Sequence, residues 1–247
     1  MNLQDISPDQ VVYWQWGVVK ISATLAYTWL VMALLVLLAL LAARSLRDDD
    51  RMSRLQNLLE IVVSGIQQQI REISHQEPGL YLPFVGTLFL FILVSNLLAV
   101  VPGYVPPTAS LSTTAALAAC VFASVFLYGI RKRGLRGYFA QYLQPTPFML
   151  PFNVIGEFSR TLALAVRLFG NMMSGAKIGA ILLAITPLIF PVVMNVLGLL
   201  TGVIQAYIFG ALAMVYIASA TRVQEERAQK NAEQHGGHPE QQGESHG

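Results

Sequence analysis

The sequence predicts an all-α polytopic membrane protein, with about five membrane-embedded helices and one amphipathic helix on the cytoplasmic surface. Two observations support this fold class. Of the 247 residues, 54% are hydrophobic and only 12% are charged, whereas soluble domains carry about 25% charged residues. Several uncharged stretches also reach the ~20 apolar residues that a helix needs to cross a bilayer. The chain has no room for a second large soluble domain.

The first half of the chain is expected to cross the membrane three times. Apolar runs predict spans at about 23–43, 82–101 and 111–130. Basic clusters follow the first and third spans, at 44–54 and 131–137, and basic residues favour the cytoplasmic side. The Pro-rich turn at 102–110 carries no Lys or Arg, so we place it outside. The N-terminus is therefore expected outside and the C-terminus in the cytoplasm.

Two further segments belong to this half. Residues 1–22 form an external N-terminal segment, whose Tyr13, Trp14 and Trp16 favour a membrane interface. The first span is too long for the core of a signal peptide and lacks a basic region before it, so we expect a retained helix. Residues 55–75 have apolar side chains at helical spacing but are too polar to span. We expect a helix lying on the cytoplasmic surface.

The second half predicts a hairpin of over-long helices. Residues 152–186 contain no proline, and a helix of this length would extend ~52 Å at 1.5 Å per residue. The hydrocarbon core is only ~30 Å thick. A second long segment covers 192–220, after a turn at Pro187–Pro191. Helices longer than the bilayer must tilt or partly leave it, so we expect a tilted hairpin.

Composition also restricts the chemistry. The formal net charge of +2 is too small to indicate a nucleic-acid partner. Cys120 is the only cysteine, so an intrachain disulfide or a Cys-based metal site is excluded. Three of the four histidines lie in the polar tail at 221–247, at spacings that fit no defined metal site. We expect a solvated, disordered tail, no metal site and no cofactor.

Arg167 is the most informative single residue, because it places a permanent charge within an apolar helix. A charged residue at mid-membrane costs ~2.5–3.5 kcal/mol on insertion scales. Glu157 and Arg160 are spaced to pair with each other on one helix, and no other carboxylate occurs between 158 and 224. Arg167 then needs water or a carboxylate from a partner subunit. The alternative is an arginine that snorkels to the surface or pairs within the chain for rigidity.

Other polar residues accompany Arg167. Asn171 and Ser174 follow it at i+4 and i+7, on one helix face. On the second long helix Thr201 and Gln205 form a similar polar face, although ordinary hydrogen bonding between helices also explains them. Three residues are secondary candidates for ion translocation: Lys177, Thr201 and Asn195. Lys177 lies about a quarter-turn from the face of Arg167, and we expect it to snorkel into lipid.

Four motifs in order carry a family resemblance. They are PGYVPPTASLSTT at 102–114, FNVIGEFSR at 152–160, RLFGNMMSG at 167–175 and QAYIF at 205–209. In these motifs the chain resembles the a subunit of the membrane (FO) sector of F-type ATP synthase. The resemblance covers roughly residues 75–220.

The resemblance implies an ion-translocating stator that has no catalytic residues of its own. Its partners would be a rotor ring of small hairpin c subunits, each with a membrane carboxylate, and the peripheral-stalk b subunit, in the inner membrane of a bacterium. Arg167 matches the family's essential arginine, which meets the ring carboxylates and separates two aqueous half-channels. The residues expected to act in ion translocation are Arg167, Asn171, Gln205, Glu157 and Ser174.

Three departures from the family pattern concern acid and base groups. Ala176 stands where many members have an acid or histidine, and Gly198 stands where some have one on the last helix. The outer loop has Thr108 and Ser110 where an acid is common. The half-channels are therefore short of titratable groups, which suggests a divergent, sodium-type branch.

Two other classes of function fit the sequence less well. An independent secondary transporter is the main alternative, but transporters commonly show internal repeats, and none is evident in the sequence. A membrane-embedded enzyme is disfavoured because the sequence contains neither HExxH nor GxSxG.

Overall fold

Helices make up nearly all of the structure, a computed structural model that describes residues 12–16, 19–45, 54–74, 77–101, 103–142, 150–185 and 190–235. A short antiparallel hairpin of β1 (Val12–Trp16) and β2 (Val19–Ser22) comes first. The helices are α1 (Ala23–Ser45), α2 (Arg54–Ser74), α3 (Leu82–Leu97), α4 (Leu111–Tyr142), α5 (Leu150–Ile185) and α6 (Phe190–His235). The hairpin is an addition to the all-α prediction, and its β-branched and aromatic residues favour strands.

Four helical stretches within the described residues are long and apolar enough to cross a membrane. They are Ala23–Leu41, Leu82–Val100, Leu111–Lys132 and Val192–Thr221. The first three coincide with the spans predicted in the first half of the chain, which are candidates by length and composition, and the chain is a polytopic membrane protein. Helix α5, which carries Glu157, Arg160, Arg167 and Lys177, is not among them. That α5 is also embedded therefore stays a prediction.

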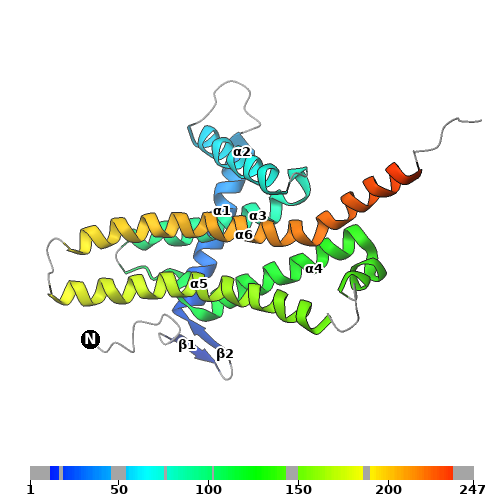
Figure 1. Ribbon diagram of the computed structural model, residues 1–247. Helices are drawn as coiled ribbons and strands as arrows, with labels where there is room; N and C mark the ends of the chain where they lie inside the picture. Colours follow the sequence, from blue (N-terminus) through cyan, green and yellow to red (C-terminus); the bar gives the residue numbers. More distant parts are fainter. Residues whose placement is uncertain are drawn as a thin grey trace, which may run out of the picture.

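Helices α5 and α6 form the predicted hairpin. They lie side by side and run across the direction of α1 (Figure 1). Helix α6 continues to His235, so the expectation of a disordered tail from residue 221 is wrong for 221–235. These residues are rich in Glu, Gln, Ala, Lys and Arg, which favour helix, and the first glycine after them is Gly236. Residues 236–247 lie outside the described part of the chain.

Helix α6 is the centre of the packing, since α2, α3, α4 and α5 all contact it. Residues from four helices form one core cluster, including Ile92, Val121, Leu168, Phe209 and Ala213. A second cluster packs α2 against α4 and α6. It includes Ile70, Tyr81, Val125, Met214 and Ile217. Ile70 is buried whereas Ile61 is exposed, as expected of an amphipathic helix that lies on the bundle with one face free.

Of two predicted connections between helices, the structure contains one as expected, whereas the other is largely helical. The turn after α3 is present, with a positive φ of 86° at Gly103 and a short helical turn at Pro107–Ala109. The basic segment at 131–137 is not a simple loop, because α4 runs on to Tyr142 with one interruption at Gly134. Gly134 has φ 71°, a left-handed conformation that glycine adopts without steric cost.

Candidate functional site

Arg167 points away from the core of the bundle. Leu164 and Leu168, on either side of it, are almost completely buried, whereas Val166 and Arg167 are exposed. The buried leucines hold α5 in one orientation, and that orientation turns the guanidinium outward. Arg167 forms no ion pair or hydrogen bond with any residue that the structure describes. The described part of the chain therefore leaves its charge uncompensated.

A hydrogen bond between two amides joins α5 to α6 one turn away from Arg167. Asn171 Nδ2 donates to Gln205 Oε1 at 2.7 Å. Gln205 is 2% exposed, and its Nε2 has no partner among the described residues. Ser174 Oγ donates to the backbone oxygen of Asn171 at 3.3 Å. Asn171, Ser174 and Gln205 are therefore brought together, next to Arg167 on α5.

Glu157 and Arg160 pair with each other, as predicted. Arg160 Nη1 lies 3.3 Å from Glu157 Oε1, and the Arg160 guanidinium lies 5.8 Å from the centre of the Tyr216 ring on α6. The Thr161 hydroxyl donates to the backbone oxygen of Glu157. Glu157 is thus occupied within its own helix and does not neutralise Arg167.

The secondary candidates are less closely connected. Lys177 and Asn195 are exposed, and Thr201 is half-buried on α6. None of the three forms a hydrogen bond or ion pair with the described residues. No group of His, Cys, Asp and Glu residues in the described part of the chain could hold a metal ion.

The sequence reasoning missed a buried polar group between α3 and α6. Asn96 Nδ2 donates to the backbone oxygen of Gly202 at 3.0 Å, and the Thr108 hydroxyl donates to Asn96 Oδ1 at 2.7 Å. The sequence does carry a signal, because Asn96, with Ser95 directly before it, interrupts an apolar run. An amide in such a run must find a hydrogen-bond partner when it is buried.

Two further buried hydroxyls lie in the same region. Burial raises the pKa of Tyr104 above its usual value, so this residue stays a neutral phenol. The Ser95 hydroxyl is close enough to offset part of that rise, but the pair lacks hydrogen-bond geometry. Tyr27 on α1 also donates to the backbone oxygen of Gly103 at 2.9 Å and packs edge-on against the Tyr104 ring. These contacts hold the turn after α3 against the bundle.

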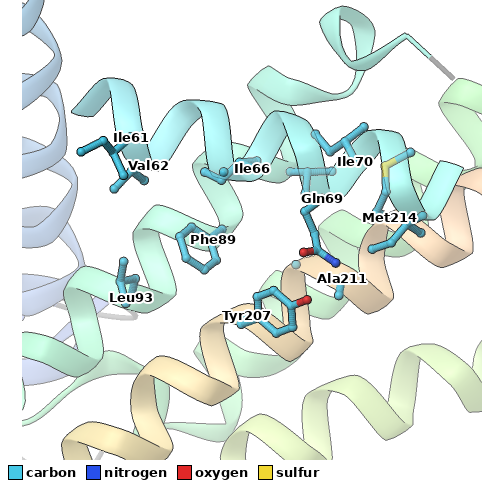
Figure 2. Close-up of a pocket in the computed structure, with 14 residues that line it drawn as sticks. Ile61, Val62, Ile66, Gln69, Ile70, Phe89, Leu93, Tyr207, Ala211 and Met214 are labelled. Atoms are coloured by element: carbon cyan, nitrogen blue, oxygen red, sulfur yellow. The ribbon is translucent and has the colours of Figure 1, made fainter. Parts of the chain in front are cut away.

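An apolar cavity of about 370 Å³ lies elsewhere, between α2, α3 and α6. Figure 2 shows Ile66 of α2, Phe89 of α3 and Met214 of α6 around it, with the amide of Gln69 reaching from α2 toward α6. Its lining includes neither Arg167 nor Asn171 nor Gln205. The cavity is therefore separate from the arginine and the amide pair.

The amino-acid sequence is similar to known proteins over most of its length. Residues 25–218 match the family model described as "ATP synthase A chain". "ATP synthase subunit a 2" of Acaryochloris marina is 60% identical over 228 residues, which cover 92% of this chain and 97% of that protein. "ATP synthase subunit a" of Nitrosospira multiformis is 60% identical over 87% of this chain and 86% of its own length. "ATP synthase subunit a 1" of Chlorobaculum parvum is 58% identical over 89% of this chain and 97% of its own length.

Proposed function

The chain belongs to the ATP synthase A chain family, and we propose that Arg167 is the residue at which this subunit meets the carboxylates of a rotor ring. The protein is subunit a of an F-type ATP synthase. This subunit is the ion-translocating stator and a non-catalytic component of the membrane sector. The alternative of an independent secondary transporter is therefore not retained.

The uncompensated guanidinium of Arg167 is the observation that carries the proposal. Arg167 lies on the exposed side of α5 beside the apolar Ala163 and Val166, with the polar Asn171 one turn further on. A charge on such a face is costly in a membrane unless a partner or water compensates it. A carboxylate from a facing subunit satisfies that requirement. An opposite charge within ~4–6 Å also favours the ionised form of a carboxylate, so each ring carboxylate would release its ion as it reaches Arg167.

The neighbouring polar residues suit the passage of an ion on either side of Arg167. Asn171 and Gln205 are neutral and hydrogen-bond each other, so they offer polar atoms without competing for the ring carboxylate. The unpartnered Nε2 of Gln205 is a donor for a water molecule. Ser174 and Glu157 would extend this polar lining. The positive charge of Arg167 would repel cations and so prevent a direct leak between two half-channels.

The proposal extends to topology and partners. We place the N-terminus outside and the C-terminus in the cytoplasm of a bacterial inner membrane, with α5 embedded beside α6. The apolar residues exposed along α6, including Val196, Leu200 and Ile204, would face the ring of c subunits beside Arg167. The peripheral-stalk b subunit and lipid would cover other faces.

The proposal is tested by Arg167→Ala in the whole complex, reconstituted in vesicles. We expect ATP-driven ion pumping and ion-driven ATP synthesis to be lost while the complex assembles normally. Arg131→Ala is the matched control, because Arg131 is exposed on α4, just before the interruption at Gly134. Full coupled activity of Arg167→Ala would overturn the proposal.

The choice of ion remains a separate hypothesis. The names of the relatives do not support a sodium-type branch, so that part of the sequence interpretation stays a prediction. ATP-driven Na⁺ uptake that persists with a protonophore would support it. Complete collapse of uptake would indicate protons.

A further inference from the structure

A single buried amide joins three parts of the chain at the C-terminal end of α3. Asn96 is 2% exposed and Thr108 is fully buried. Asn96 uses its Nδ2 on the backbone of α6, at Gly202, and its Oδ1 on the hydroxyl of Thr108 in the turn after α3. Both polar atoms of the amide are therefore engaged, and α3, the turn and α6 are held at one point.

Gly202 makes this contact very close. A Cβ atom at position 202 would lie 2.8 Å from the Cβ of Asn96, which is shorter than two carbon atoms allow without displacement. Only glycine lets the α6 backbone approach α3 to this distance. The carbonyl of Gly202 can accept the amide of Asn96 because a backbone oxygen has two lone pairs.

The contact lies on the same face of α6 as Gln205. Gly202, Gln205, Ala206 and Phe209 follow one another at helical spacing, and all four are buried. Gln205 is less than one turn from Gly202. A shift of α6 at Gly202 therefore moves Gln205 relative to Asn171, to which it is bonded at 2.7 Å.

We propose that Asn96 is a positioning residue for ion translocation, which fixes α6 at Gly202 and thereby holds Gln205 against Asn171 beside Arg167. Thr108 orients the amide of Asn96 from the turn after α3. This inference rests on the proposed roles of Arg167, Asn171 and Gln205. The turn after α3 then contributes to transport by supporting the amide pair of Asn171 and Gln205, without contacting the ion.

The choice of an amide supports a role in positioning. An apolar residue at position 96 would fill the same space without the need to satisfy two buried polar atoms. Hydrogen bonds between membrane helices add little stability on average, because the separated helices find other partners. A hydrogen bond is directional, however, and fixes the register between two helices in a way that apolar contact does not.

The test compares transport by whole complexes in vesicles that carry substitutions in subunit a. Asn96→Leu keeps the branched shape but removes both hydrogen bonds. We expect coupled transport to fall roughly fivefold or more, the scale of one lost buried hydrogen bond, with an unchanged amount of assembled complex. In a Gln205→Leu background, Asn96→Leu should add little further loss, because it acts through Gln205. If Gln205→Leu transports too slowly to measure, Asn171→Ser serves as the background.

An equal loss from Asn96→Leu in both backgrounds, or transport at the normal rate, would overturn the inference. If Asn96→Leu prevents assembly, Thr108→Val decides. It should lower transport below the normal rate, and Thr108→Ser should restore the rate. The matched control is Thr114→Val, since the buried Thr114 hydroxyl bonds, among the described residues, only to the backbone oxygen of Leu111 in its own helix. Equal rates for Thr108→Val and Thr114→Val would also overturn it.

The parallel Arg167→Ala complex separates this inference from the function on which it rests. Loss of transport in Arg167→Ala, together with normal transport in Asn96→Leu and Thr108→Val, rejects the positioning role alone. Normal transport in Arg167→Ala rejects the proposed function itself.

Discussion

Arg167 on α5 and Asn96 on α3 are both polar residues in apolar helices, yet the chain treats them in opposite ways. Asn96 is buried and has both polar atoms bonded within the chain. Arg167 is exposed and has no partner among the described residues. The chain satisfies the polar group that holds its own helices together. It leaves unsatisfied the group that, in our proposal, must react to another subunit.

A substitution that gives Arg167 a partner within the chain would remove its difference from Asn96. Ala163 is exposed one turn before Arg167, and a glutamate at i with an arginine at i+4 is a favourable helical pair. We expect Ala163→Glu to lower coupled transport tenfold or more, because Arg167 would be neutralised before a ring carboxylate arrives. The measurement is ATP-driven pumping in vesicles, normalised to the amount of assembled complex.

Ala163→Gln is the matched control for this experiment. It adds a side chain of the same size without the charge, so it reports any steric effect on the facing subunit. If the glutamate and glutamine variants transport equally well, an unpaired Arg167 is not required.

The close packing of Asn96 against Gly202 predicts a smaller effect, which is on the stability of the subunit. A Cβ at Gly202 would lie 2.8 Å from that of Asn96, whereas nothing lies within 4 Å of one at Gly198. We expect Gly202→Ala to destabilise the subunit by about 1–3 kcal/mol, the usual cost of overpacking, and Gly198→Ala to have no such cost. The temperature at which subunit a aggregates from the solubilised complex measures both. Equal temperatures would mean that the close approach of α3 and α6 is not needed.

The two residues also differ in how far the sequence could predict them. Arg167 stands out because no carboxylate near it in the sequence is free to pair with it. The partnership of Glu157 and Arg160 follows from their spacing, and the structure confirms it. Both inferences depend on contacts within one helix, whose geometry is known in advance.

Contacts between helices could not be predicted in the same way. Asn96 and Gly202 are 106 positions apart, and nothing local to either residue names the other. The sequence indicated Asn171 and Gln205 as candidates but not the bond between them. The predicted end of α6 at residue 220 is too early, because a polar composition predicts disorder there although the same residues have a high helix propensity.

Substitution of Glu157 is expected to have the smallest effect on transport, and it compares a second charged residue of α5 with Arg167. Unlike Arg167, it already has a partner, and Arg160 is half exposed, so the pair contributes at most about 1 kcal/mol. We expect Glu157→Gln to lower coupled transport by a few-fold at most, because the amide keeps the size and hydrogen bonding of the side chain. Pumping measured beside Arg167→Ala gives the scale. A loss as complete as that of Arg167→Ala would mean that Glu157 carries a proton along the pathway. The difference between a paired and an unpaired charge would then no longer separate structure from transport on α5.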